Sequence, residues 1–140
     1  MKILLASDGS EYTKKALDFL IQHKQLLGED KELLVIHAQM LLPTIFASAI
    51  NVKNALEINE RVADDVFSPI KKILEKHAIK QRYLSVVGSV VKEIIEAADN
   101  EGVHLILMGA HGRNAAAGAL MGSVAQRVVA HSTVPVLLVR

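Results

Sequence analysis

The chain has 140 residues, of which 51% are hydrophobic, with no cysteine and a formal net charge of +1. This length is typical of one domain, and the hydrophobic content suffices for a core without disulfides or a structural metal. The lack of cysteine excludes thiol chemistry, and the balanced charge excludes strong attraction to nucleic acid or to an anionic membrane. Because no apolar run reaches the length of a secretory signal or a membrane span, we expect one cytoplasmic domain over residues 1–140.

Five short apolar segments have the length and the flanking turns of buried strands. The first is Ile3–Ala6, which is followed by an Asp-Gly turn. The others cover residues 32–38, 82–87, 104–109 and 134–139. Because these segments are apolar almost throughout, we expect the strands to be covered on both faces.

The segments between the strands have the periodicity of amphipathic helices. Ser10 has the position of an N-cap for the first helix, whose apolar positions continue to Leu27. A long helical period over residues 54–78 contains Pro69, which predicts either a kink or a second helix with Ser68 as its N-cap. Two further helices are predicted, one from residue 90 to at least 98 and one over residues 123–131.

Strands and helices therefore alternate along the whole chain. This order predicts an α/β fold with an open, doubly wound parallel sheet of five strands and helices on both faces. Such sheets bind ligands beyond the carboxyl ends of their strands, where the strand order reverses. The loops after the first, second and fourth strands are the candidate binding loops.

Two regions have features that point to interactions. Residues 39–53 are apolar without a clear period, and a loop of this length is usually a lid, a binding surface or a mobile segment. The last predicted strand, residues 134–139, is apolar and would leave an apolar sheet edge, which is either paired or prone to aggregation. We interpret this strand as the interface of a homodimer.

The candidate chemistry lies in the stretch GAHGRNAAAGALMGS, residues 109–123. Gly109 ends a strand, where the lack of a Cβ allows a close approach, and Gly112 is predicted to take a positive φ that turns the loop amides in one direction. Gly122 and Ser123 stand at the start of a helix, whose free amide groups favour an anion. Ser123 either caps this helix or bonds a phosphate. Each residue alone fits an ordinary turn, but together they favour a phosphate cradle.

The spacing G-x2-G-x9-G-S, formed by Gly109, Gly112, Gly122 and Ser123, resembles the nucleotide-binding motif of the universal stress protein family. The opening KILLASDGSEYTKKAL and the closing third of the chain also resemble that family. The resemblance implies a Rossmann-like open sheet with strand order 3-2-1-4-5, a homodimer through the last strand, and membership of the ATP-binding branch.

The resemblance also implies which residues bind the nucleotide. Ala6, Ser7 and Asp8 would surround the adenine and ribose, although Asp8 is also compatible with a plain turn before a helix. Val35 would contact the adenine through its backbone and side chain. Met108 and Gly109 would line the ribose side, and His111 would contact ribose or phosphate. The phosphates would be held by Gly112, Arg113, Gly122, Ser123 and Val124.

The expected ligand is ATP, ADP or AMP, with Mg²⁺ held mainly by the phosphates, because Arg113 is the only charged residue of the spacer between the glycines. The six histidines lack metal-ligand spacing, and we expect most of them at the surface or at helix ends. No residue pattern indicates a general base for the γ-phosphate, so rapid hydrolysis is not expected.

Three functions fit these features. The first is a nucleotide-dependent regulatory dimer of the stress response, whose state is read by a downstream protein partner. The second is a slow ATPase or a self-phosphorylating enzyme, with Ser123 or a nearby hydroxyl as the acceptor. The third is a nucleotide-independent interaction or chaperone-like module that uses the apolar residues 39–53. Nucleic-acid binding is excluded by the dispersed basic residues and by the aromatic content of only 4%.

Overall fold

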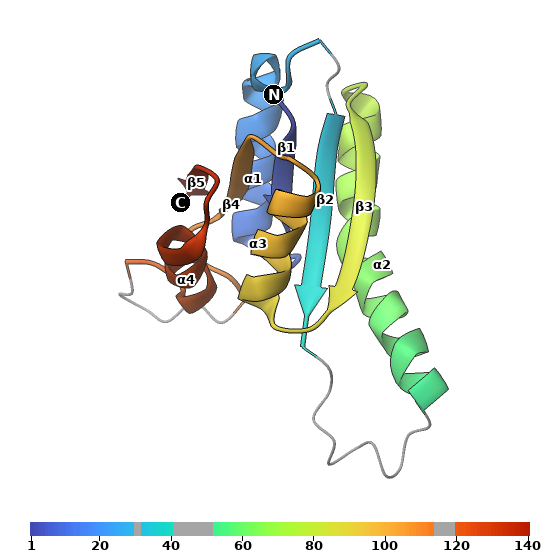
Figure 1. The fold of residues 1–140 in the computed structure, drawn as a ribbon. Helices are drawn as coiled ribbons and strands as arrows, with labels where there is room; N and C mark the ends of the chain where they lie inside the picture. The colour runs from blue at the N-terminus through green and yellow to red at the C-terminus, as the bar shows by residue number, and fades with distance from the viewer. Residues whose placement is uncertain (30–31, 41–51, 114–119) are drawn as a thin grey trace.

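The computed structural model describes residues 1–29, 32–40, 52–113 and 120–140 (Figure 1). Most of the predicted 39–53 segment, and Gly118 of the glycine-rich stretch, lie outside the described residues. The strands are β1 (Ile3–Ala6), β2 (Glu32–Gln39), β3 (Lys80–Val87), β4 (Leu105–Gly109) and β5 (Val136–Val139). The helices are α1 (Glu11–Gln22), the 3₁₀ helix η1 (Lys24–Leu27), α2 (Val52–Lys76), α3 (Val90–Asn100) and α4 (Ser123–His131).

The five strands form one parallel sheet in the order β3-β2-β1-β4-β5, which confirms the predicted fold class and strand order. β1 is the central strand, and the order reverses at it: Ala6 pairs with Ile36 of β2 on one side and with Met108 of β4 on the other. The carboxyl ends of β1, β2 and β4 therefore meet at one edge of the sheet, where doubly wound proteins bind their ligands.

Each face of the sheet carries its own hydrophobic cluster. Side chains of β1 alternate between the two: Ile3 and Leu5 pack with α1 and α2, and Leu4 and Ala6 pack with α3 and α4. Figure 1 shows the two helix pairs on opposite sides of the sheet. Because β1 is covered on both faces, its four residues are buried without the polar alternation of a half-exposed strand.

The first helix begins as predicted but ends earlier. The Ser10 hydroxyl accepts a hydrogen bond from the Thr13 amide at 3.3 Å, as expected of an N-cap. α1 ends at Gln22, since the chain leaves helical geometry at His23 and tightens into η1. Gly28 then ends η1 with φ 68°, a conformation that glycine adopts at little cost.

Helix α2 is continuous from Val52 to Lys76 and includes Pro69, so the predicted restart at Ser68 is wrong. Pro69 lacks an amide proton and leaves the helix one hydrogen bond short. Its side chain is exposed while Val66 and Ile70 are buried, so the carbonyl left unpaired lies on the face that water can reach. Within the described residues, no helix is both long and apolar enough to cross a membrane.

The two edge strands differ in their protection. β3 alternates exposed and half-buried side chains, and its outward positions include Lys80, a charge that discourages strand addition. All four side chains of β5 are half-buried and apolar. β5 begins two positions after the predicted start because Pro135 cannot donate to a ladder; its carbonyl accepts from the Ile106 amide instead.

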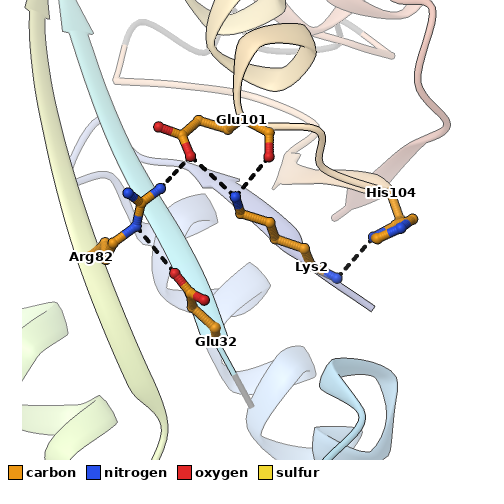
Figure 2. A network of polar contacts seen from close by, with 5 residues as sticks. All are labelled: Lys2, Glu32, Arg82, Glu101 and His104. Atoms are coloured by element: carbon orange, nitrogen blue, oxygen red, sulfur yellow. Dashed lines mark hydrogen bonds and ion pairs between the residues drawn. The ribbon is translucent and has the colours of Figure 1, made fainter. Parts of the chain in front are cut away.

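At the amino end of the sheet, polar side chains tie β1, β2 and β3 to the turn after α3 (Figure 2). Glu101 accepts from the ammonium of Lys2 at 3.1 Å and from the guanidinium of Arg82, which also pairs with Glu32 at 3.1 Å. Hydrogen bonds from Lys2 and Arg82 lower the pKa of Glu101 below its usual value. These groups lie at the end of the sheet opposite the binding edge, so we assign them a structural role.

Candidate functional site

A cavity of about 660 Å³ lies at the carboxyl ends of β1, β2 and β4. Eleven of the twelve predicted site residues line it: Ala6, Ser7, Asp8, Met108, Gly109, His111, Gly112, Arg113, Gly122, Ser123 and Val124. Further lining residues that the sequence did not predict come from α1, β2, α2 and α3, among them Thr13, His37, Ala38 and Val62. The volume is in the range of small-molecule sites.

The twelfth residue, Val35, is not part of the cavity, and this prediction is corrected. Val35 is fully buried, and its side chain packs in the cluster under α1 and α2. Its backbone is also enclosed, because it pairs with Leu5 on one side and with Tyr83 on the other. A ligand at the sheet edge therefore cannot reach it.

Ala38 is a residue of β2 that lines the cavity just beyond the end of the β1–β2 ladder. The Ile36 carbonyl accepts from the Ser7 amide, and the Gln39 carbonyl accepts from the Gly88 amide, so even-numbered residues of β2 point their backbone groups toward β1. The β1–β2 ladder ends at Ala6, opposite Ile36. Among the described residues, no strand partner stands opposite Ala38, so its N–H and C=O lie on the β1 side beyond the end of β1, where Ala38 lines the cavity.

Asp8 connects the loop after β1 to the glycine loop after β4. Its Oδ1 accepts from the Ser10 amide at 3.0 Å and from the Thr13 hydroxyl at 2.8 Å, and its Oδ2 accepts from the Arg113 amide at 3.1 Å. The Arg113 side chain donates from Nε to the Asp8 carbonyl. These hydrogen bonds hold the two loops together at the point where the strand order reverses.

The environment of Asp8 favours its ionised form. Partial burial alone would raise its pKa, but the hydrogen bonds from Ser10, Thr13 and Arg113 outweigh this effect and hold the pKa below its usual value of 3.8. Asp8 is therefore a carboxylate at neutral pH and an acceptor for any donor that the cavity admits.

The first two motif glycines are required by close approaches. A Cβ at Gly109 would lie 2.5 Å from the Cβ of Tyr12, so this glycine lets α1 pack against the end of β4. A Cβ at Gly112 would lie 2.7 Å from Oδ2 of Asp8. Gly112 does not have the positive φ that was predicted, because among the described glycines only 9, 28 and 102 have one. A side chain at 112 would displace the Asp8 carboxylate, which accepts from the Arg113 amide.

The third motif glycine forms the start of α4. Gly122 is the N-cap, and its amide donates to the Ala110 carbonyl at 2.8 Å, which holds the helix end beside β4. Ser123 is exposed and is the first helical residue, so the interpretation that it caps the helix is wrong. Among the described residues no side chain caps α4, so the amides of its first turn are available to an anion at the cavity.

The cavity has two chemically different halves. Apolar side chains form one half, which includes Ile36 of β2, Met108 of β4, Val90 and Ile94 of α3, Met121 before α4 and Val124 of α4. The loops after β1 and β4 form a polar half with Asp8, Arg113 and the α4 N-terminus. Such a site suits an amphiphilic ligand with a flat apolar part and an anionic part.

Two histidines line this cavity. His111 stacks at a tilt on Tyr12, with ring centroids 5.0 Å apart, and its Nδ1 is buried with no partner in the described part of the chain. His37 is only 4% exposed, so it is an exception to the expectation of surface histidines. No group of three or more His, Cys, Asp or Glu among the described residues could hold a metal ion.

These features define a doubly wound α/β protein with a ligand cavity at the reversal point of its strand order. The chain belongs to the universal stress protein family, whose sequence model matches residues 1–140. Two similar relatives are the universal stress protein MJ0577 of Methanocaldococcus jannaschii, at 32% identity over 99% of this chain and 94% of that protein, and a Thermus aquaticus universal stress protein, at 33% identity over 99% of this chain and 97% of that protein.

Solved structures agree with this assignment. The structure of MJ0577 has a TM-score of 0.83 and 33% identity, and the match covers 99% of this chain and 94% of that one. An Arabidopsis thaliana family member solved with AMP bound has a TM-score of 0.66 at 12% identity and is covered to 90%, against 99% of this chain. A universal stress protein in complex with cAMP has a TM-score of 0.65 at 22% identity, covering 97% of that chain and 100% of this one. At the last two identities the likeness concerns the fold.

Proposed function

We propose that the chain binds an adenine nucleotide, ATP in particular, in the cavity at the carboxyl edge of the sheet. The observation that carries the proposal is the start of α4, where Gly122 is an N-cap without a side chain and the residues of the first turn line the cavity. A helix N-terminus of this kind favours a phosphate through its free amides and its dipole. Family members of similar fold that were solved with AMP and with cAMP support the nucleotide class.

The apolar half of the cavity is the proposed base site. The Ala38 N–H and C=O would offer one donor and one acceptor at its wall. They would complement the Watson–Crick edge of adenine, which has an amino donor beside a ring nitrogen acceptor. The residues Ile36, Met108 and Ala6 would contact the base from the sheet. Asp8 lies between this half and the glycine loop, where a carboxylate would accept from the ribose hydroxyls.

Arg113, Gly122, Ser123 and Val124 are the proposed phosphate contacts. Arg113 is the one cation among the described lining residues. Because the described residues include no cluster of metal-ligating side chains, Mg²⁺ would be held mainly by the phosphates themselves. The backbone amides of α4 would then provide much of the affinity for the anion.

Binding without rapid hydrolysis is the proposed mode of action. Asp8 is the only carboxylate among the described lining residues, and three donors already engage it, so it is poorly placed to activate water. Slow self-phosphorylation is the second candidate function, because the Ser123 hydroxyl is exposed and does not cap α4. In the first candidate, a homodimer through β5 would present the nucleotide-bound state to a partner protein.

Mass spectrometry of the small molecules released on denaturing the purified protein tests this proposal. We expect an adenine nucleotide in the released fraction, or saturable binding of Mg-ATP if none co-purifies. Release or transfer of radiolabelled γ-phosphate at about one event per second would favour an enzyme over a binding protein. Absence of both a released nucleotide and Mg-ATP binding would favour the nucleotide-independent module instead.

A further inference from the structure

His37 is a buried polar residue that the proposed nucleotide contacts do not use. It lies near the carboxyl end of β2, on the face that α2 covers, and is only 4% exposed. Phe67 of α2 meets its ring edge-on, at 87° and with 6.2 Å between ring centroids. The imidazole is therefore held in one orientation beside the cavity that it helps to line.

The hydrogen bonding of this ring determines which nitrogen carries the proton. Nδ1 lies 2.8 Å from the Ser7 carbonyl oxygen, which can only accept, so Nδ1 carries the hydrogen. Nε2 is buried and has no partner in the described part of the chain, so a proton there would be unsatisfied. The neutral ring is thus expected as the Nδ1–H tautomer.

The bond from His37 replaces a bond of the sheet. Continuation of the β1–β2 ladder beyond Ala6 and Ile36 would pair the Ala38 amide with the Ser7 carbonyl. That carbonyl instead accepts from His37, and the Ala38 amide has no partner among the described residues. The Ser7 amide and hydroxyl both donate to the Ile36 carbonyl, at 2.8 and 3.0 Å, so Ser7 is fixed to β2 at every polar group.

The same bond fixes the orientation of Asp8. The Ser7 carbonyl and the Asp8 amide belong to one planar peptide unit. His37 holds the oxygen of this unit, and the Thr13 hydroxyl accepts from its N–H at 3.2 Å. Asp8 then extends from the held peptide to the Arg113 amide of the glycine loop. A continuous path of hydrogen bonds runs from β2 through the end of β1 to the loop after β4.

We propose that His37 is a positioning residue of the cavity: by holding the Ser7–Asp8 peptide, it directs Asp8 to the glycine loop and leaves the Ala38 amide free for the ligand. This role rests on the proposed nucleotide site for its effect on affinity. The positioning itself is independent of any ligand, because every bond in the path lies within the chain.

Two substitutions separate the hydrogen bond from the volume of the ring. His37→Leu removes the donor, whereas His37→Asn keeps an N–H near the place of Nδ1. We expect His37→Leu to weaken Mg-ATP binding about tenfold or more and His37→Asn to restore most of that affinity, as measured by calorimetry. Equal affinity in wild type and His37→Leu, or an equal loss in both variants, would overturn the role.

Two NMR readouts test the positioning without nucleotide. Nitrogen-15 shifts of the wild-type His37 ring should report a proton on Nδ1, and an Nε2–H ring would contradict the proposal. The pKa of the Asp8 carboxyl should rise toward 3.8 in His37→Leu and stay low in His37→Asn. If wild type binds no nucleotide, the proposed function fails while these readouts still decide the positioning. If His37→Leu does not fold, the tautomer and the His37→Asn affinity decide it.

Discussion

At the scale of single residues, Asp8 is the group that joins the two binding loops. We expect Asp8→Ala to weaken binding of adenosine and of ATP alike, about tenfold or more, because it removes an acceptor at the ribose and the contact to the Arg113 amide. Asp18→Ala, an exposed site on α1, is the matched control and should bind as wild type does. An unchanged affinity for adenosine in Asp8→Ala would exclude Asp8 from the ribose site.

The lowered pKa of Asp8 also predicts a dependence of stability on pH. A carboxyl whose pKa is lower in the folded chain than its usual 3.8 stabilises the fold at pH values above 3.8. That contribution is lost as the pH falls through 3.8 and the folded-state pKa. As the pH falls across this acidic range, the free energy of unfolding measured in urea should therefore decrease more steeply for wild type than for Asp8→Asn. Parallel curves for the two proteins would contradict the direction of the shift.

The sequence predicted half of the cavity-lining residues, those that follow strands whose order the resemblance supplied. It misplaced the β2 contact at Val35, since only the lengths of the neighbouring strands decide where a backbone becomes free, and that point is Ala38. The motif singled out Gly112, but the motif does not reveal its close approach to the Asp8 carboxylate, which lies far away in the sequence. Contacts of this kind leave no local pattern.

At the scale of elements, α2 contains an avoidable defect. Pro69 lies on the exposed face of a continuous helix. Alanine is favoured over proline in a helix interior by about 3 kcal/mol. Up to about 1 kcal/mol of this gain is offset because proline makes the unfolded chain stiffer. We expect Pro69→Ala to raise the free energy of unfolding by about 2–3 kcal/mol in urea denaturation. Lys72→Ala, also exposed on α2, is the control and should change it little. A loss of stability in Pro69→Ala would mean that the proline supports the helix.

Helix periodicity predicted that α2 exists but left two outcomes at Pro69. The choice depends on which face of the helix carries the proline, and that face is set by packing of Val66 and Ile70 on the sheet. The early end of α1 has a similar origin: Leu27 continued the apolar period, but it is buried from η1 rather than from the helix. Tertiary packing therefore decided the boundaries that local pattern left open.

At the scale of the whole molecule, alternation of apolar strands with amphipathic helices was enough to predict the layers of the sheet. The assembly remains a prediction. Sedimentation analysis should give twice the chain mass for wild type, and Leu138→Asp in β5 should shift it to the monomer, because a charge opposes pairing at that edge. Val87→Asp on the opposite edge strand is the control. A monomeric wild type, or dissociation by both variants, would exclude β5 as the homodimer interface.

The start of α4 is the proposed binding place of the nucleotide's phosphates. A Cβ at Gly122 would lie 3.3 Å from the His111 Cα and 3.4 Å from the Ala110 oxygen, so a branched side chain would push the glycine loop away from the helix. Gln126→Val adds the same side chain at an exposed position of α4 and is the control.

Calorimetric titration of Mg-ATP into these three proteins, freed of nucleotide, is the most direct test. We expect saturable binding by wild type and Gln126→Val, and a loss of at least about tenfold in Gly122→Val with the fold retained by circular dichroism. Binding of Mg-ATP by Gly122→Val as tightly as by wild type would contradict phosphate binding at the start of α4. No binding by wild type itself would contradict nucleotide binding altogether.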